Sequence, residues 1–170
     1  MIPPAQFLEH VIRPVLSGLA EYDERLHSRA AEQLLLGTAI AESRLGAFVQ
    51  KGGGPARSFF QIEASGDYAN PRTFEDIYER YLRNRPGLLV VVQGWLFPNM
   101  PAFKQLPGNQ HFACAIARVK YWMMPEPLPD ADDAEGMARY HVKYYNTALG
   151  KATEERFIEL FREHVAPIGS

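Results

Sequence analysis

The sequence lacks several features that would assign a protein to a compartment or a membrane. Cys114 is its only cysteine, so no disulfide can form within the chain, as is usual for folding in a reducing compartment. No apolar run approaches the roughly 20 residues that span a bilayer. The first residues, MIPPAQFLEHVIRP, lack the basic start and long apolar core of a secretory signal. We therefore expect a protein made in the cytoplasm without a signal peptide and without a membrane partner.

Blocks of one charge and metal-binding patterns are also missing. The formal net charge is −2 and there is no lysine-rich block, which argues against a nucleic-acid partner. None of the five histidines has a neighbour at metal-ligand spacing, and H-E-x-x-H is absent. No phosphate-cradling glycine loop or G-x-S-x-G pattern occurs. Cys114 lies in an apolar stretch typical of a buried, inert thiol. We expect no metal and no cofactor.

The sequence does contain the pattern of an ordinary globular protein with many helices. Its 170 residues favour one domain, and 46% hydrophobic residues suffice for a core. Apolar residues recur at spacings of three and four, which predicts a mainly α fold of six or seven helices with little strand. The predicted helices cover residues 4–20 (interrupted at Pro14), 29–44, 73–82, 86–95, 109–124, 133–146 and 153–164. The three valines at 90–92 leave a strand as the alternative there, and we predict a loop over residues 97–108.

Glu42 is the most informative carboxylate. It ends a helical run, residues 34–41, that is apolar on nearly every side. Desolvation and the negative end of the helix dipole both disfavour its ionised form. A carboxyl group that keeps its proton near neutral pH is what a glycosidic leaving group needs. The alternative is that Glu42 points into solvent at a frayed helix end, or pairs with Arg44 or Arg57.

Three short motifs spaced along the chain resemble those of the lysozyme-like lytic transglycosylase family. That family has a helix ending in Glu-Ser, then Gly-Leu-(Met/Phe)-Gln-(Ile/Leu), and later a Tyr-Asn pair. The corresponding residues are Glu42-Ser43, the segment from Ser58 to Ile62 that contains Gln61, and Tyr145-Asn146. Glu42 and Gln61 are 61 − 42 = 19 residues apart, close to the family's spacing. The resemblance covers residues 34–150 and implies one lysozyme-like domain over residues 1–170, with residues 1–27 as an N-terminal helical extension.

The resemblance also implies a reaction and a set of site residues. The reaction is cleavage of the bond between N-acetylmuramic acid and N-acetylglucosamine in peptidoglycan glycan strands. Glu42 would protonate the leaving oxygen and then act as base on the muramyl C6 hydroxyl, so a single carboxylate suffices, unlike in most glycosidases. Gln61 would hold an N-acetyl or backbone group, and Tyr145 would orient Glu42 or the substrate. If hydrolysis occurs instead, Glu63 and Asp67 are candidates for a second carboxylate. The substrate-binding set implied is Ser43, Ser58, Phe60, Gln61, Tyr145 and Asn146.

The chain departs from the family at one position that matters. Ser58 stands where the family has glycine, and a positive φ there would strain serine. Phe59 and Phe60 either stack on sugars or fill the core.

A second likeness suggests a biological setting. The GTAIAES and GGGPA stretches are similar to those of small proteins of tailed bacteriophages. This implies synthesis in a host cytoplasm, incorporation into the virion, and other virion or tail proteins as partners. Two alternatives remain open. One is a non-enzymatic virion or tail structural protein built on a lysozyme-like domain. The other is a helical adaptor unrelated to sugars.

Overall fold

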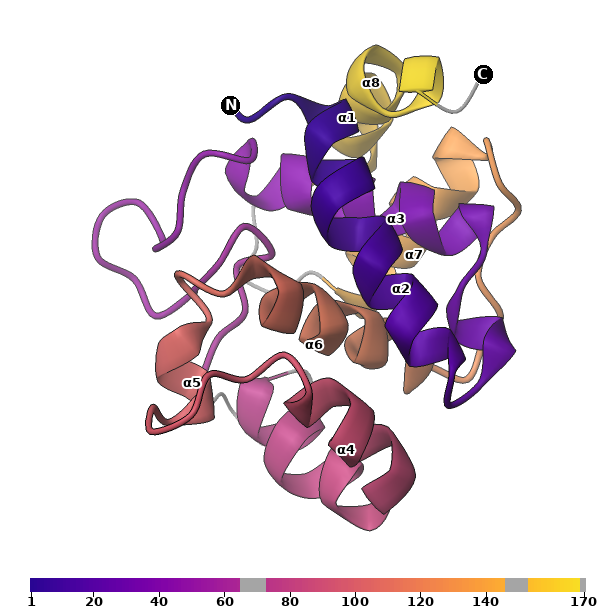
Figure 1. Ribbon diagram of the computed structural model, residues 1–170. Helices are drawn as coiled ribbons and strands as arrows, with labels where there is room; N and C mark the ends of the chain where they lie inside the picture. The colour runs from indigo at the N-terminus through magenta and orange to yellow at the C-terminus, as the bar shows by residue number, and fades with distance from the viewer. Residues whose placement is uncertain (65–72, 146–152, 169–170) are drawn as a thin grey trace.

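Helices provide nearly all the regular structure of this chain (Figure 1). The computed structural model describes residues 1–64, 73–145 and 153–168. Its α-helices are α1 (Pro4–Phe7), α2 (Arg13–Ala20), α3 (Arg29–Ser43), α4 (Pro86–Gln93), α5 (Ala102–Gln105), α6 (Gln110–Trp122), α7 (Ala134–Tyr144) and α8 (Glu154–His164). Shorter π or 3-10 turns cover Leu8–Ile12, Glu24–Leu26, Glu75–Tyr81, Leu82–Asn84 and Ala166–Ile168. Strand pairing within the described residues is limited to two isolated bridges, Val49–Arg57 and Arg57–Ile62. The prediction of a mainly α protein is confirmed.

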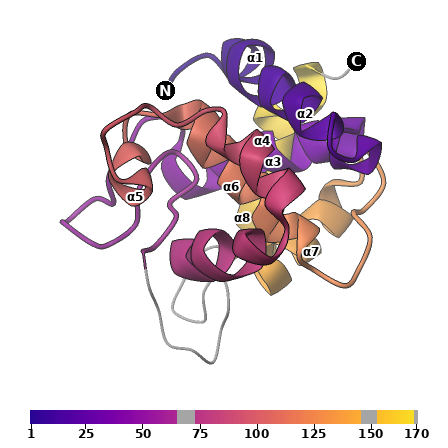
Figure 2. The same ribbon diagram turned by 60° about the horizontal axis from the view of Figure 1, so that its bottom comes forward.

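Two helices, α3 and α6, are enclosed on almost every side. All residues from Leu34 to Ile40 in α3 and from Phe112 to Tyr121 in α6 are buried. The helix α3 packs against α6, α7 and α8, and α6 also packs against α2 and α4. Figure 1 shows α3 near the centre, with α8 above it, α6 below it and α4 at the opposite end; Figure 2 gives a second view. A helix that is apolar all round requires such neighbours.

The N-terminal helix is continuous through Pro14 but changes its winding. The N–H of Arg13 donates to the carbonyl of Leu8, five residues back, so Leu8–Ile12 forms a π turn. Proline lacks an N–H and its ring crowds the carbonyl four residues before it, and the wider turn accommodates both. Residues 1–27, expected as an extension, supply Ile12 and Leu16 to the same buried core as the rest of the chain.

Local capping signals set several helix starts. Ser28 Oγ accepts from the N–H of Ala31 at 3.1 Å and so caps the start of α3, where the sequence predicts a helix from residue 29. Thr73 and Asp76 form a capping box where the sequence predicts a helix from residue 73, since the N–H of Thr73 donates to Asp76 Oδ2 at 3.2 Å. Pro86 begins α4, so the segment containing the three valines is a helix and not a strand.

The segment predicted as a loop over residues 97–108 contains the short helix α5, which the prediction missed. Pro101 precedes its first turn, and the side chain of Gln105 bonds both backbone groups of Phe97, at 2.8 and 3.0 Å. A buried side-chain amide therefore fixes this turn, which hydrophobic spacing does not reveal.

The end of α3 turns the chain sharply just after Glu42. The N–H of Arg44 donates to the carbonyl of Ile40, and Arg44 and Leu45 both adopt left-handed backbone, with φ of 56° and 49°. The helix ends at Ser43, one residue before its predicted end, and non-glycine residues take the left-handed positions that follow. Within the described residues, no helix combines the length and apolarity needed to cross a membrane.

Candidate functional site

Glu42 faces a buried histidine. Its side chain, in the last turn of α3, is 19% exposed, and its Oε1 lies 3.2 Å from Nε2 of His141, a wholly buried imidazole on α7. The contact has ion-pair length but not the alignment of a hydrogen bond, which leaves Nε2 without a hydrogen-bond partner within the described residues. The terminal torsion of a glutamate side chain is soft, so the carboxyl can turn toward Nε2. Arg57, an expected partner, instead donates to the carbonyls of its own loop, Gly54 and Ala56.

Behind His141 runs a chain of buried polar contacts. Nδ1 of His141 lies 2.9 Å from the hydroxyl of Tyr121 on α6. That hydroxyl lies 2.7 Å from Oγ1 of Thr38, which donates to the carbonyl of Leu34 at 2.8 Å. Burial raises the pKa of Tyr121 well above its usual value, and the negative charge of Glu42 adds to the shift. Three helices, α3, α6 and α7, thus meet at one imidazole.

Tyr145 joins this centre to the loop that carries the second motif. Its ring stacks on that of His141 at 5.4 Å, and the ring of Phe157 from α8 also stacks on the imidazole at 4.9 Å. The Tyr145 hydroxyl donates to the carbonyl of Phe60 at 2.7 Å. Burial, with the nearby charge of Glu42, raises the pKa of Tyr145 well above its usual value. The tyrosine thus packs on the imidazole that faces Glu42 and holds the carbonyl of the residue before Gln61.

Ser58 adopts the backbone conformation that suits glycine. Its φ is 70°, and the residue is fully buried. Its N–H donates to the carbonyl of Phe48 at 2.8 Å, and its Oγ accepts from the N–H of Phe60 at 3.1 Å. The position at which the resembled family has glycine therefore has positive φ here, and the hydroxyl partly offsets the strain by satisfying a buried N–H.

Gln61 supports its own loop. Its φ is 47°, and its Nε2 donates to the carbonyls of Ser58 at 2.7 Å and Ala47 at 3.3 Å. Both acceptors belong to the backbone of the loop that carries Gln61. The side chain is partly exposed, so its face toward solvent is accessible to a ligand.

Several residues expected to bind substrate are instead buried in the walls of the site. The Ser43 hydroxyl is buried and donates to the carbonyl of Ala39 at 3.0 Å. Phe60 is wholly buried and its ring packs on Phe7, 6.0 Å between centroids, so it offers no face to a sugar. Ser58 and Tyr145 are buried as described above. Asn146 and Asp67 lie outside the described residues, and Glu63 is partly exposed.

An exposed aromatic ring lies on the same loop. Phe48 is 53% exposed and stacks on the buried Phe59 at 5.0 Å and 13°. Its carbonyl also holds the N–H of Ser58. Phe59 and Phe60, the rings that the sequence offered as candidates for stacking, are both buried, whereas the ring of Phe48 on the same loop is exposed.

Sequence reasoning missed His141, Tyr121 and Thr38. Two local signals point to them. Thr38 lies one helical turn before Glu42 on α3, and His141 lies one turn before Tyr145, on the buried face of α7. Neither signal identifies the contact between the two helices, because that contact depends on packing.

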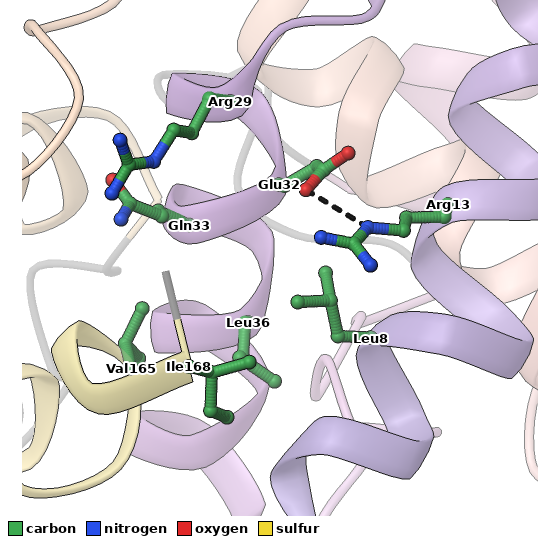
Figure 3. Close-up of a pocket in the computed structure, with 8 residues that line it drawn as sticks. All are labelled: Leu8, Arg13, Arg29, Glu32, Gln33, Leu36, Val165 and Ile168. Atoms are coloured by element: carbon green, nitrogen blue, oxygen red, sulfur yellow. Dashed lines mark hydrogen bonds and ion pairs between the residues drawn. The ribbon is translucent and has the colours of Figure 1, made fainter. Parts of the chain in front are cut away.

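Two cavities lie elsewhere in the described structure, and Glu42 lines neither. The first, of about 370 Å³, is shown in Figure 3; its charged groups are paired, Arg13 with Glu32 at 3.2 Å and Arg29 with Asp132 at 2.9 Å. The second, of about 440 Å³, is lined in part by Arg118, whose pKa burial lowers to about 10. Neither cavity contains the carboxyl group or the motif residues of the Glu42 site. Their size alone does not identify them as functional.

Comparisons with known proteins add no assignment. No family model, curated protein or solved structure matches this chain. Among the described residues, no group of three or more His, Cys, Asp or Glu side chains gathers in a way that could hold a metal. Burial raises the pKa of the Cys114 thiol, which weakens it as a nucleophile. The arrangement around Glu42 is therefore the strongest candidate site that the described residues offer.

Proposed function

We propose that this chain is a lysozyme-like lytic transglycosylase that cleaves peptidoglycan glycan strands, with Glu42 as its acid. One observation carries the proposal: the three separate motifs meet. Tyr145 stacks on the imidazole that faces Glu42, and its hydroxyl holds the carbonyl of Phe60 next to Gln61. Chance matches scattered over a helical chain have no reason to converge in this way.

The proposed reaction needs one carboxyl group and no water. The Glu42 carboxyl donates its proton to the oxygen that links N-acetylmuramic acid to N-acetylglucosamine, and the bond from C1 to that oxygen breaks. The muramyl C6 hydroxyl then attacks C1 and gives its proton to the Glu42 carboxylate. The product carries a 1,6-anhydro ring, and Glu42 regains the proton that it donated. The partial exposure of Glu42 gives substrate access, while the buried helix beneath it holds the carboxyl in place.

In this proposal the residues around Glu42 have different roles, some in substrate binding and others in fixing the loop. Gln61, already bonded to backbone carbonyls of its loop, presents its exposed side to an N-acetyl group. Phe48 offers an aromatic face on which a sugar ring can stack. Tyr145 and Ser58 are buried and fix the geometry of the loop.

A non-enzymatic virion or tail protein on the same kind of domain is the second candidate. It is favoured by the burial of Ser43, Ser58 and Phe60 and by the two cavities, which lie away from Glu42. Incorporation into a virion belongs to both candidates and is tested by immunoblotting purified particles.

The deciding experiment is digestion of purified peptidoglycan sacculi by wild type and Glu42→Gln, with mass spectrometry of the released muropeptides. The proposal expects anhydro-muropeptides from wild type and none from the variant. Products heavier by one water would instead indicate a hydrolase. No release by either protein would reject the enzyme and leave the structural candidate.

A further inference from the structure

The buried contacts behind His141 constrain where its protons lie. Three consecutive contacts link four groups: the carbonyl of Leu34, Thr38 Oγ1, the Tyr121 hydroxyl and His141 Nδ1, at 2.8, 2.7 and 2.9 Å. Each distance is that of a hydrogen bond, and all four groups are shielded from water. Each contact therefore needs one hydrogen, because two bare oxygens at such a distance repel each other.

Counting hydrogens leaves one arrangement. The carbonyl can only accept, so the Thr38 hydroxyl donates to it. Thr38 then has no hydrogen left, so the Tyr121 hydroxyl must donate to Thr38. The Tyr121 hydroxyl then has no hydrogen left to donate, so Nδ1 of His141 must supply the hydrogen for the contact between them. The weaker Thr38–Nδ1 contact of 3.4 Å is satisfied by the same N–H.

The other ring nitrogen faces Glu42. With Nδ1 protonated, a neutral His141 has a bare lone pair at Nε2, 3.2 Å from Glu42 Oε1. A bare nitrogen beside an ionised carboxylate is repulsive and leaves a buried acceptor unsatisfied. One additional proton removes both costs, whether it resides on the carboxyl or on Nε2.

We infer that Glu42 and His141 share one proton between Oε1 and Nε2, and that the chain Tyr121–Thr38–Leu34 holds it there by fixing Nδ1 as a donor. His141 is thus a positioning residue that keeps the acid loaded. This inference deepens the proposed function. Only the catalytic consequence of the shared proton rests on that proposed function. The proton count itself concerns the free protein.

The ionisable groups around the pair come from three parts of the fold. Tyr121 and Cys114 belong to α6, and Tyr145 follows α7. Lys120, also on α6, donates to the carbonyl of Tyr145 at 3.1 Å and lies 3.8 Å from the centre of its ring. The helix α8 contributes the uncharged ring of Phe157. Burial raises the pKa values of Tyr121, Tyr145 and Cys114, so these three groups stay neutral near neutral pH.

The direct test is nuclear magnetic resonance of the free protein, labelled with 15N in histidine and 13C in glutamate. We expect Nδ1 of His141 to remain protonated at every pH at which the protein is folded. The Nε2 and Glu42 carboxyl signals should change together in one step as the shared proton leaves. In Glu42→Gln this joint step is expected to disappear. A neutral His141 with bare Nδ1 and protonated Nε2 overturns the inference.

Variants separate proton sharing from simple packing. The double variant Thr38→Val/Tyr121→Phe removes both acceptors of Nδ1–H, so His141 can protonate Nε2 alone and needs no shared proton; its spectrum should show the inverted tautomer. Tyr140→Phe is the matched control, because Tyr140 is a neighbouring buried tyrosine whose hydroxyl donates to the Glu126 carbonyl at 2.8 Å. It should leave the His141 signals as in wild type. An unchanged tautomer in Thr38→Val/Tyr121→Phe counts against the inference.

The catalytic consequence is read from the pH dependence of sacculus cleavage. In His141→Asn the amide can still donate toward Tyr121, but nothing shares the Glu42 proton. We expect the alkaline limit of activity to move down by about one pH unit or more, which is about a tenfold loss of rate on that limb. An unchanged profile overturns the positioning role. If wild type does not cleave sacculi, the proposed function fails, but the spectra of the free protein still decide whether the proton is shared. The spectra also decide this if His141→Asn does not fold.

Discussion

The hydroxyl of Tyr145 donates to the carbonyl of Phe60 over 2.7 Å, across 85 residues of sequence. This bond fixes the loop that carries Gln61 to the centre that contains Glu42. It is buried, so loss of the donor leaves a carbonyl without a partner.

Tyr145→Phe is therefore expected to lower the free energy of unfolding by about 1–2 kcal/mol and to reduce cleavage of sacculi. Urea denaturation measures the first effect and muropeptide release the second. Tyr140→Phe again serves as control, since it also removes a hydroxyl that donates to a carbonyl. It should cost similar stability and leave cleavage intact. Equal effects of the two variants on cleavage would contradict the role of the Tyr145 bond.

Ser58 provides a test of backbone strain. Both Ser58→Gly and Ser58→Ala remove the hydroxyl that accepts from the N–H of Phe60, but only glycine relaxes at a φ of 70°. We expect the glycine variant to be more stable than the alanine variant by about 1 kcal/mol, measured by thermal or urea unfolding. The opposite order, normal at a negative φ, would show that the position is not left-handed.

Gly37 tests the packing of α3 on α8. A Cβ at Gly37 would lie 2.7 Å from Cζ of Phe157, a ring that is almost fully buried and stacks on His141. Gly37→Ala should destabilise the protein by about 1–3 kcal/mol despite its better helix propensity, and should shift the His141 resonances. At Gly18 a Cβ meets Trp95 at the same 2.7 Å, but Trp95 is partly exposed and can move. Gly18→Ala should therefore lower the free energy of unfolding much less than Gly37→Ala, as urea unfolding of the two variants will show. Equal losses of stability would contradict the packing of α3 on α8.

The buried tyrosines predict the behaviour of the protein in alkali. Burial raises the pKa of Tyr140 to about 12, and raises those of Tyr121 and Tyr145 well above the usual value. Because the folded pKa values exceed the unfolded ones, this stability is fully present below about pH 10. It is lost as pH rises through the folded values. In a tyrosinate absorbance titration, these three of the eight tyrosines should ionise only with unfolding. Smooth ionisation of all eight in the folded protein would refute the burial.

Much of the fold could be predicted from sequence, because its determinants are local. Apolar spacing and the caps at Ser28 and Thr73 indicate helices whose starts the structure confirms. The π turn before Pro14 and the short helix α5 were missed. The first resolves a steric conflict and the second depends on the side chain of Gln105, and neither is encoded by hydrophobic periodicity.

The site could be predicted only in part. Glu42 is identifiable because a carboxylate at the end of an apolar helix is unusual in itself. Its partner His141 lies 141 − 42 = 99 residues away, and the local spacing of His141 from Tyr145 does not reveal the contact with Glu42. Burial of Phe60 likewise follows from its packing on Phe7, which the sequence does not reveal.

Replacing the carboxyl of Glu42 by an amide removes the proposed acid, so we compare Glu42→Gln with Glu32→Gln for the rate of anhydro-muropeptide release from sacculi. Glu32 is a sound control, because it lies on the same helix and also contacts a histidine, His27 at 2.9 Å. We predict a loss of at least about a hundredfold for Glu42→Gln and a rate near wild type for Glu32→Gln. Release by Glu42→Gln at the wild-type rate would contradict the account.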